Sequence, residues 1–197
     1  SRDDVKELVE NAKRLSPAVV EEAVPDRVGY GLLQQVLRGL LRERIPVRNI
    51  PLILEALADN VERTKDPETL VENVRQRLAR TICEQFADDK GVIHSVTLDP
   101  ETENRLVAAV GGGAAGAEVD AASVGPAWLR ELVERVERAL AEASRGGGEG
   151  VLLVRSNVRR FVSELVRASL PKVSVLAYGE VAGAPSIETH AIVNMED

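Results

Sequence analysis

The chain has 197 residues, of which 44% are hydrophobic, 29% charged and only 3% aromatic. This length suits one large domain or two small ones, and the composition supports a buried core of aliphatic side chains. The net charge of −7 and the shortage of aromatic rings argue against nucleic acid as a main partner, because an acidic surface repels phosphates.

Cysteine usage and hydropathy indicate the compartment. The single cysteine, Cys83, cannot form a disulfide within the chain, which predicts a reducing environment. No apolar run approaches the roughly 20 residues that a membrane-spanning helix needs, and the polar start is unlike a signal peptide. Because the only methionine is Met195, we expect a piece of a longer parent protein whose membrane segments would lie upstream.

The first 25 residues predict two entry helices. Ser1 and Asp4 have the spacing of a capping box. Ser16 followed by Pro17 resembles a helix cap with proline at the first helical position. Apolar residues recur at helical spacing and predict the buried face of the first helix: Val5, Leu8, Val9, Ala12 and Leu15.

Residues 32–87 predict a helical core. Pro46 separates two short helices, because proline lacks an amide hydrogen and clashes with the preceding turn. Asn49 can cap the second, and Asp66 a third whose apolar residues repeat every four positions as far as Phe86. The helix before Pro46 has a broad apolar face: Leu32, Leu33, Val36, Leu37, Leu40, Leu41 and Ile45. We therefore predict an all-helical subdomain over residues 1–88.

The pattern changes to strands alternating with helices over residues 89–197. Segments rich in β-branched residues predict four strands: 91–98, 151–154, 173–178 and 187–193. Helices are predicted between the first three strands, which favours parallel pairing among them, whereas the last two strands fit a hairpin. Ser156 is the expected cap of the helix after the second strand. The predicted fold class is α+β: the helical subdomain followed by a small α/β subdomain with a mixed sheet.

Residues 111–125 are rich in small side chains and predict a flexible loop. Gly111, Gly113 and Gly116 match G-x-G-x-x-G, which in dinucleotide sites follows a strand and opens a helix. Here the glycines follow a predicted helix, so a loop is the better interpretation. A nucleotide-binding α/β enzyme that uses this loop stays the alternative function.

The histidines and the cysteine offer little chemistry in the sequence. Alternation places His94 on one strand face with Val92, Val96 and Leu98, which favours a core or edge histidine. Neither His94 nor His190 has a second metal ligand at coordinating spacing, so we expect no zinc site. Cys83 lies beside the apolar stripe of its helix and is interpreted as a buried, inert thiol, although a pairing with either histidine in space stays open. We expect no catalytic, cofactor-binding or metal-binding residue.

Four arginines surround Pro46: Arg38, Arg42, Arg44 and Arg48. The first two lie one turn apart on the polar side of the predicted helix, and the other two bracket the proline. They either keep the surface soluble or form a basic rim that contacts an acidic surface on a neighbouring protein. They are the candidate interaction surface.

Several segments resemble, in order and spacing, the export-gate family of bacterial flagella and type III injectisomes. The most distinctive are Leu33-Gln-Gln-Val-Leu37 and Ile45-Pro-Val-Arg-Asn-Ile50, followed by Ile53-Leu-Glu-Ala-Leu-Ala-Asp59, Val74-Arg-Gln-Arg-Leu-Ala-Arg80, Val96-Thr-Leu-Asp-Pro100 and Leu170-Pro-Lys-Val-Ser-Val-Leu-Ala-Tyr-Gly-Glu180. The resemblance covers nearly the whole chain. The small-residue stretch 111–126 and Gly179 depart from the family pattern. Thr64-Lys-Asp-Pro67 and Thr97-Leu-Asp-Pro100 favour the flagellar branch, and the injectisome branch stays open.

The resemblance implies the last two subdomains, one helical and one α/β, of the cytoplasmic part of an inner-membrane protein. Such a part forms a nine-membered ring beneath the export channel and is not known as an enzyme or for a cofactor. The implied partners are other subunits of the same protein, export chaperones and substrates, and other export-apparatus proteins, without nucleic acid. Contact with the membrane would come only through the missing N-terminal part. No chaperone-docking residue is assigned, because the family's docking dimple lies mostly in earlier subdomains.

Overall fold

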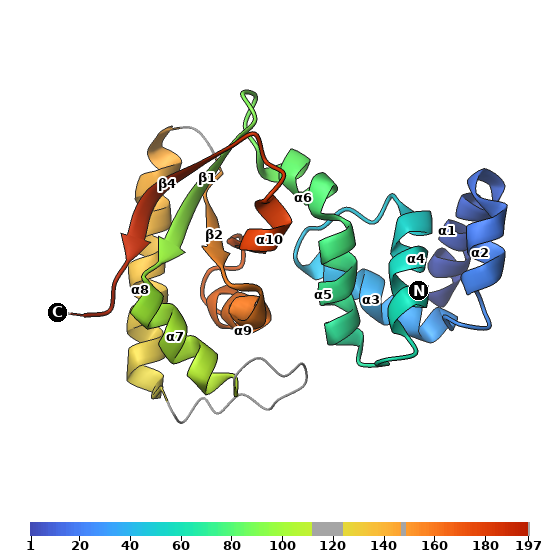
Figure 1. Cartoon of the computed structure of the whole chain (residues 1–197), viewed down its shortest axis with the longest axis horizontal. Helices are drawn as coiled ribbons and strands as arrows, with labels where there is room; N and C mark the ends of the chain where they lie inside the picture. The colour runs from blue at the N-terminus through green and yellow to red at the C-terminus, as the bar shows by residue number, and fades with distance from the viewer. Residues whose placement is uncertain (112–123, 147–148, 197) are drawn as a thin grey trace. The chain divides into compact units, whose positions relative to one another are not determined.

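The structure is a computed structural model that describes residues 1–111, 124–146 and 149–196. The chain divides into two compact units, Ser1–Ile82 and Cys83–Asp197. The first unit is built from helices, and the second combines helices with a four-stranded sheet (Figure 1). The predicted α+β class is thereby confirmed. The division falls a few residues before the boundary that the sequence places at residue 88.

Side-chain caps begin several helices of the first unit. These helices are α1 (Arg2–Leu15), α2 (Pro17–Ala23), α3 (Tyr30–Arg42), α4 (Ile50–Asn60), α5 (Pro67–Arg77) and α6 (Ala79–Phe86), the last of which continues into the second unit. The predicted capping box at Ser1 is present. The Asn49 side chain accepts a hydrogen bond from the Leu52 amide at 3.2 Å, and Asp66 accepts one from the Thr69 amide at 2.9 Å. Ser16 makes no side-chain capping bond, so only Pro17 remains of the signal predicted there.

The predicted long helix from Asp66 to Phe86 is wrong in one respect. It is two helices, α5 and α6, which meet at Leu78 with φ −87° and ψ 10°. The apolar spacing survives the break because the Leu78 amide still bonds the Val74 carbonyl and the Ile82 amide bonds the Leu78 carbonyl, both at 2.9 Å. Periodicity therefore identifies the buried face but does not reveal a break that leaves the phase unchanged.

Helix α3 packs closely on α5. A Cβ added at Gly39 would lie 2.6 Å from a methyl group of Val71, so this glycine permits the close approach. The buried face of α3 and the following turn consists of Leu33, Val36, Leu37, Leu40 and Ile45. Leu41, which the sequence assigns to this face, is instead 55% exposed. The buried face is therefore narrower than predicted.

The sheet of the second unit is parallel throughout. Its strands are β1 (Val92–Leu98), β2 (Val151–Val154), β3 (Ser174–Ala177) and β4 (Ser186–Val193), in the order β3-β2-β1-β4. The predicted parallel pairing among the first three strands is confirmed. The mixed sheet and the terminal hairpin are wrong, because the chain passes from β3 through the one-turn helix α10 (Tyr178–Val181) to the opposite edge and pairs with β1.

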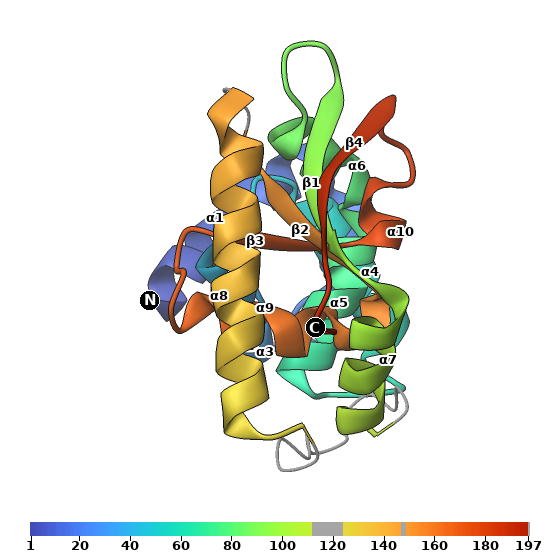
Figure 2. The same cartoon turned by 90° about the vertical axis from the view of Figure 1, so that its left-hand side faces the viewer.

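Helices cover the sheet. The long helix α8 (Pro126–Ala143) contacts β4, β1 and β2, and α9 (Ser156–Arg167) contacts β3 (Figure 2). Helix α7 (Pro100–Ala109) begins at Asp99, whose side chain accepts a hydrogen bond from the Thr102 amide at 3.2 Å. The cap of α9 is Arg155, so Ser156 is already helical and makes no cap, contrary to expectation. The predicted loop 111–125 lies mostly outside the described residues.

Candidate functional site

The four predicted arginines lie on the C-terminal half of α3 and on the segment that follows it. Arg38 and Arg42 are on α3, while Arg44 and Arg48 lie in the segment between α3 and α4, and all four are exposed. Within the described residues, Arg38, Arg42 and Arg48 form no hydrogen bond or ion pair. We call these four arginines together with the exposed Leu41 the basic rim. Exposed charges without a partner in their own chain, here Arg38, Arg42 and Arg48, can pair with opposite charges on another protein.

A Schellman turn shapes the basic rim. The Ile45 amide bonds the Leu40 carbonyl at 2.9 Å, and the Arg44 amide bonds the Leu41 carbonyl at 3.0 Å. This pattern places the residue after the helix cap in the left-handed region, and Arg44 has φ 61° there. Glycine is the usual residue at such a position, since a side chain costs about 1 kcal/mol. An arginine is therefore held where it weakens the local fold.

A buried ion pair fixes this turn to the rest of the unit. Glu43, the cap of α3, lies 3.3 Å from the guanidinium of Arg75 on α5. Arg75 is 1% exposed, so its charge depends on partners inside the protein. The turn of the basic rim is therefore held in place by its own backbone hydrogen bonds and by the ion pair between Glu43 and Arg75.

Helix α1 has an acidic stripe that the sequence analysis missed. Asp3, Glu7 and Glu10 are exposed and follow helical spacing, and within the described residues they make no hydrogen bond or ion pair. Arg14 ends the stripe at the next turn. The i, i+4, i+7 spacing of the three acids was the signal that could have revealed it. The helical unit thus presents unpaired charges of both signs on separate elements.

A shallow polar pocket of about 220 Å³ lies among α2, α4 and α5. Its two arginines already bond to acids of the same unit: Arg27 to Glu62 at 3.4 Å, and Arg77 to Asp59. The other lining side chains supply no nucleophile next to a base. This arrangement supports a solvated ion-pair network and no reaction.

The carboxyl edge of a parallel sheet is where nucleotides usually bind, and here it is acidic. Asp99 follows β1, and Glu101 and Glu196 lie close enough that a hydrogen bond between them raises the pKa of Glu196. Nearby, burial raises the pKa of Glu103, which accepts a hydrogen bond from the Arg155 amide at 2.9 Å. These carboxyl groups disfavour phosphates. The glycines Gly113 and Gly116 of the alternative nucleotide site lie outside the described residues.

Cys83 is buried, as predicted. Its thiol donates a hydrogen bond to the Glu180 carbonyl at 3.2 Å. Burial, together with the charges of Glu180 and Glu84, raises the pKa of the thiol, which lowers its reactivity. The hydrogen bond anchors α10 to α6.

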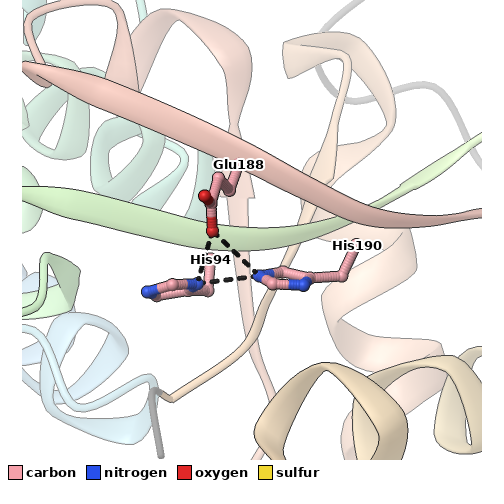
Figure 3. A group of neighbouring side chains, drawn as sticks. All are labelled: His94, Glu188 and His190. Atoms are coloured by element: carbon pink, nitrogen blue, oxygen red, sulfur yellow. Dashed lines mark hydrogen bonds and ion pairs between the residues drawn. The ribbon is translucent and has the colours of Figure 1, made fainter. Parts of the chain in front are cut away.

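The two histidines, far apart in sequence, lie side by side on β1 and β4 (Figure 3). Nδ1 of His94 is 2.7 Å from Nε2 of His190, and their ring centroids are 5.0 Å apart. Spacing along the chain does not show this proximity, which arises from strand pairing. Of the residues predicted to share the face of His94, Val92 is half-buried like His94, whereas Val96 and Leu98 are buried.

Comparisons with known proteins identify the family. The model of the FHIPEP family matches residues 1–185. The chain belongs to the FHIPEP family. A family member, the flagellar biosynthesis protein FlhA of Treponema pallidum, is 32% identical over 201 residues, which cover 100% of this chain and 28% of that protein. The chain thus spans little more than a quarter of this curated relative.

Solved structures have the same fold. The Chlamydia pneumoniae CdsV and CdsO protein complex matches with a TM-score of 0.83 at 25% identity, covering 98% of this chain and 56% of that one. The nonameric SctV-C of EPEC matches with a TM-score of 0.82, covering 98% and 57%, and at 21% identity it shows the fold alone. The resemblance to the export-gate family is confirmed. No helix among the described residues is long and apolar enough to span a membrane.

Proposed function

We propose that this chain is the C-terminal part of the cytoplasmic portion of a flagellar or type III export gate, at the inner membrane, where it serves ring assembly and docking without catalysis. The family match over residues 1–185 carries the proposal. Because the sequence relative is an FlhA protein, the flagellar branch is favoured. The EPEC protein of the same fold is a nonamer, and CdsV forms a complex with CdsO. Subunits of the same protein and other export components, including chaperones and substrates, are accordingly the proposed partners.

The basic rim is the proposed contact with a neighbouring subunit. A ring of identical subunits uses two different surfaces of each copy, which must be complementary. The basic rim and the acidic stripe of α1 are exposed, opposite in charge and unpaired at Arg38, Arg42 and Arg48 on one side and at Glu7 and Glu10 on the other. We propose that the basic rim of one copy binds the acidic stripe of the next.

The backbone of Arg44 supports a role in binding. A residue that costs stability where glycine would be favoured is typical of functional positions. Arg44 is held at φ 61° beside the other arginines. The arginine therefore adds a positive charge to the basic rim and lowers the stability of the turn.

The enzyme alternative has less support. The relatives and the structures of this fold are export proteins, and the acidic carboxyl edge of the sheet is unfavourable for phosphate groups. Calorimetry of the chain against NAD and ATP separates the two functions. Micromolar binding that Gly113→Val abolishes would establish the nucleotide site and replace the present proposal.

Charge reversal tests the proposed contact. Light scattering of a longer cytoplasmic portion of the parent should show association that weakens as salt rises, because salt screens exposed charges. Arg42→Glu should weaken this association at least about tenfold, since it replaces attraction with like-charge repulsion across the contact. The matched control is Arg138→Glu, an exposed arginine on α8 of the other unit.

A compensating change makes the test specific. Glu7→Arg alone should weaken association, and Glu7→Arg combined with Arg42→Glu should restore most of it. If Arg42→Glu leaves association unchanged, the basic rim has no part in assembly. If both single variants weaken association but the double variant does not recover, the basic rim binds a surface other than α1.

A further inference from the structure

Three side chains that can bind a metal ion converge where β1 and β4 lie side by side (Figure 3). The Oε2 atom of Glu188 lies 3.4 Å from Nδ1 of His94 and 3.6 Å from Nε2 of His190. All three ligand atoms lie within 4.8 Å of one another. His94 is largely buried, whereas Glu188 and His190 are exposed, so the group opens to solvent on one side.

Strand pairing creates the group. His94 pairs directly with Glu188 in the parallel register, which puts both side chains on one face of the sheet. The register then shifts: Ser95 pairs with Thr189, but Val96 pairs with Ala191. His190 is the additional residue of this bulge and has no partner on β1. A bulge redirects a side chain, and here it brings the His190 ring against that of His94.

Asp88 orients His94 from behind. Its Oδ2 atom lies 2.7 Å from Nε2 of His94, the ring nitrogen that faces away from the group. Its Oδ1 atom accepts hydrogen bonds from the amides of Lys90 and Val92, both at 2.9 Å, so the carboxylate is fixed by backbone. A carboxylate on Nε2 selects the tautomer with hydrogen there and leaves the Nδ1 lone pair toward Glu188 and His190. Metal-binding histidines typically have this second partner.

We propose that His94, Glu188 and His190 form a binding site for a divalent transition-metal ion, Zn²⁺ in the first place. In tetrahedral zinc sites with bonds of about 2.0–2.2 Å, neighbouring ligand atoms lie roughly 3.3–3.5 Å apart. Of the two separations from Glu188, the 3.4 Å to His94 fits this value and the 3.6 Å to His190 exceeds it by about 0.1 Å. Only the distance between the two imidazole nitrogens must lengthen, and the exposed ring of His190 can turn to allow it.

The donor set selects the class of metal. Two imidazoles and one carboxylate suit Zn²⁺ and its transition-metal neighbours, while Ca²⁺ and Mg²⁺ need more oxygen ligands. Three protein ligands leave one tetrahedral position for water. The ion would join the edge strand β4 to β1. Glu188 and His190 lie beyond residues 1–185, the range that the family model matches, so two of the three ligands belong to a part of the chain outside that match.

The site departs from the expectation that the two histidines have no metal partner. That expectation considered only neighbours along the chain. The pairing of His94 with Glu188 and the bulge at His190 supply the missing ligands from residues almost a hundred positions away.

Calorimetric titration of the chain with ZnCl₂, after removal of any affinity tag, tests the proposal. We expect one ion per chain and no comparable binding of MgCl₂ or CaCl₂. Zinc binding can be assigned to this site because the chain contains only two histidines and its single cysteine is buried. His190→Ala should weaken zinc binding at least about 100-fold, and Asp88→Asn about tenfold, because the amide no longer selects the required tautomer.

Two controls separate ligation from damage to the fold. Glu188→Gln keeps the size of an exposed side chain while removing its charge, and should weaken binding without changing the circular dichroism spectrum. Glu142→Gln, an exposed acid on α8, should leave zinc binding unchanged. Binding should also weaken on acidification, since protons compete for the imidazole nitrogens.

Nitrogen chemical shifts of the two histidine rings give a readout on the unmodified chain. Zinc should shift Nδ1 of His94 and Nε2 of His190, the atoms that face each other (Figure 3). Equal zinc affinity in His190→Ala would overturn the proposal. Ligation of His94 through Nε2, or the absence of any zinc binding by the chain, would do so as well.

Discussion

The two units differ in how far along the chain their decisive contacts extend. In the helical unit, a cap lies three residues from the amide it bonds, and the Schellman turn closes within six residues. In the α/β unit, β1 pairs with β2 and with β4, and the histidines meet across 96 positions. In the helical unit, contacts between residues close in sequence position the charged surface. In the α/β unit, the order and pairing of the strands bring the two histidines together.

The largest expected effect tests the ion pair between Glu43 and Arg75, which joins the turn of the basic rim to α5. Glu43→Gln removes the carboxylate that lies 3.3 Å from the guanidinium of the buried Arg75 and should lower the free energy of unfolding of the helical unit by about 3 kcal/mol. Urea unfolding followed by far-UV circular dichroism measures the loss. The only tryptophan, Trp128, lies on α8, so its fluorescence reports the other unit.

We expect the fluorescence transition of Trp128 to stay in place in this variant. The control is Glu55→Gln, which changes an exposed acid of α4 and should leave both transitions unchanged. An equal shift of both signals in Glu43→Gln would contradict the division into two units that differ in their stabilising contacts.

A smaller effect of opposite sign is expected at the turn. Arg44→Gly relieves the left-handed backbone and should raise the stability of the helical unit by up to about 1 kcal/mol. The same change removes a charge from the basic rim and should weaken association of the longer cytoplasmic portion. Arg44→Ala should weaken association equally with no gain in stability. A more stable Arg44→Gly variant that assembles normally would show that this arginine has no binding role.

The smallest expected effect is a pH dependence in the α/β unit. Burial raises the pKa of Glu103 above its ordinary value of 4.5, so the folded state holds this proton more tightly than the unfolded state. Its contribution to stability is complete below pH 4.5 and is lost as the pH rises through the folded-state pKa. Glu103→Gln keeps an oxygen for the Arg155 amide but removes this loss.

The stability of Glu103→Gln relative to the unmodified chain should therefore be greater at pH 7 than at pH 4. Denaturation followed by Trp128 fluorescence at both pH values measures the difference. If the stability difference between the variant and the unmodified chain is the same at both pH values, burial does not govern the ionisation of Glu103. Water would then reach the contact of Glu103 with α9.

Sequence reasoning predicts most of the elements, because caps and apolar periodicity act locally. Asn49 and Asp66 begin helices where expected. Caps and periodicity do not predict strand direction. The segment after β3 fits a turn equally well whether the next strand pairs with β3 or crosses to the other edge of the sheet. The hairpin prediction failed for that reason. Helix α10 is too short to have a periodicity of its own.

The candidate sites show the same limit. The four arginines can be found from the sequence because charges around a proline between two helices must lie near each other. The meeting of His94 with Glu188 and His190 requires the strand order, the register and the bulge, and none of these is encoded in local spacing. The place of Arg44 in the left-handed region was equally hidden, since glycine marks such a turn more often than arginine.

The pairing of β1 with β4 has a consequence for synthesis. Translation runs from the N-terminus, so the helical unit can fold from its short-range contacts as soon as it emerges from the ribosome. The sheet must wait for the strand at residues 186–193 to leave the exit tunnel. Until then the edge of β1 has unbonded peptide groups, and a nascent chain stalled before residue 186 would expose them to other polypeptides.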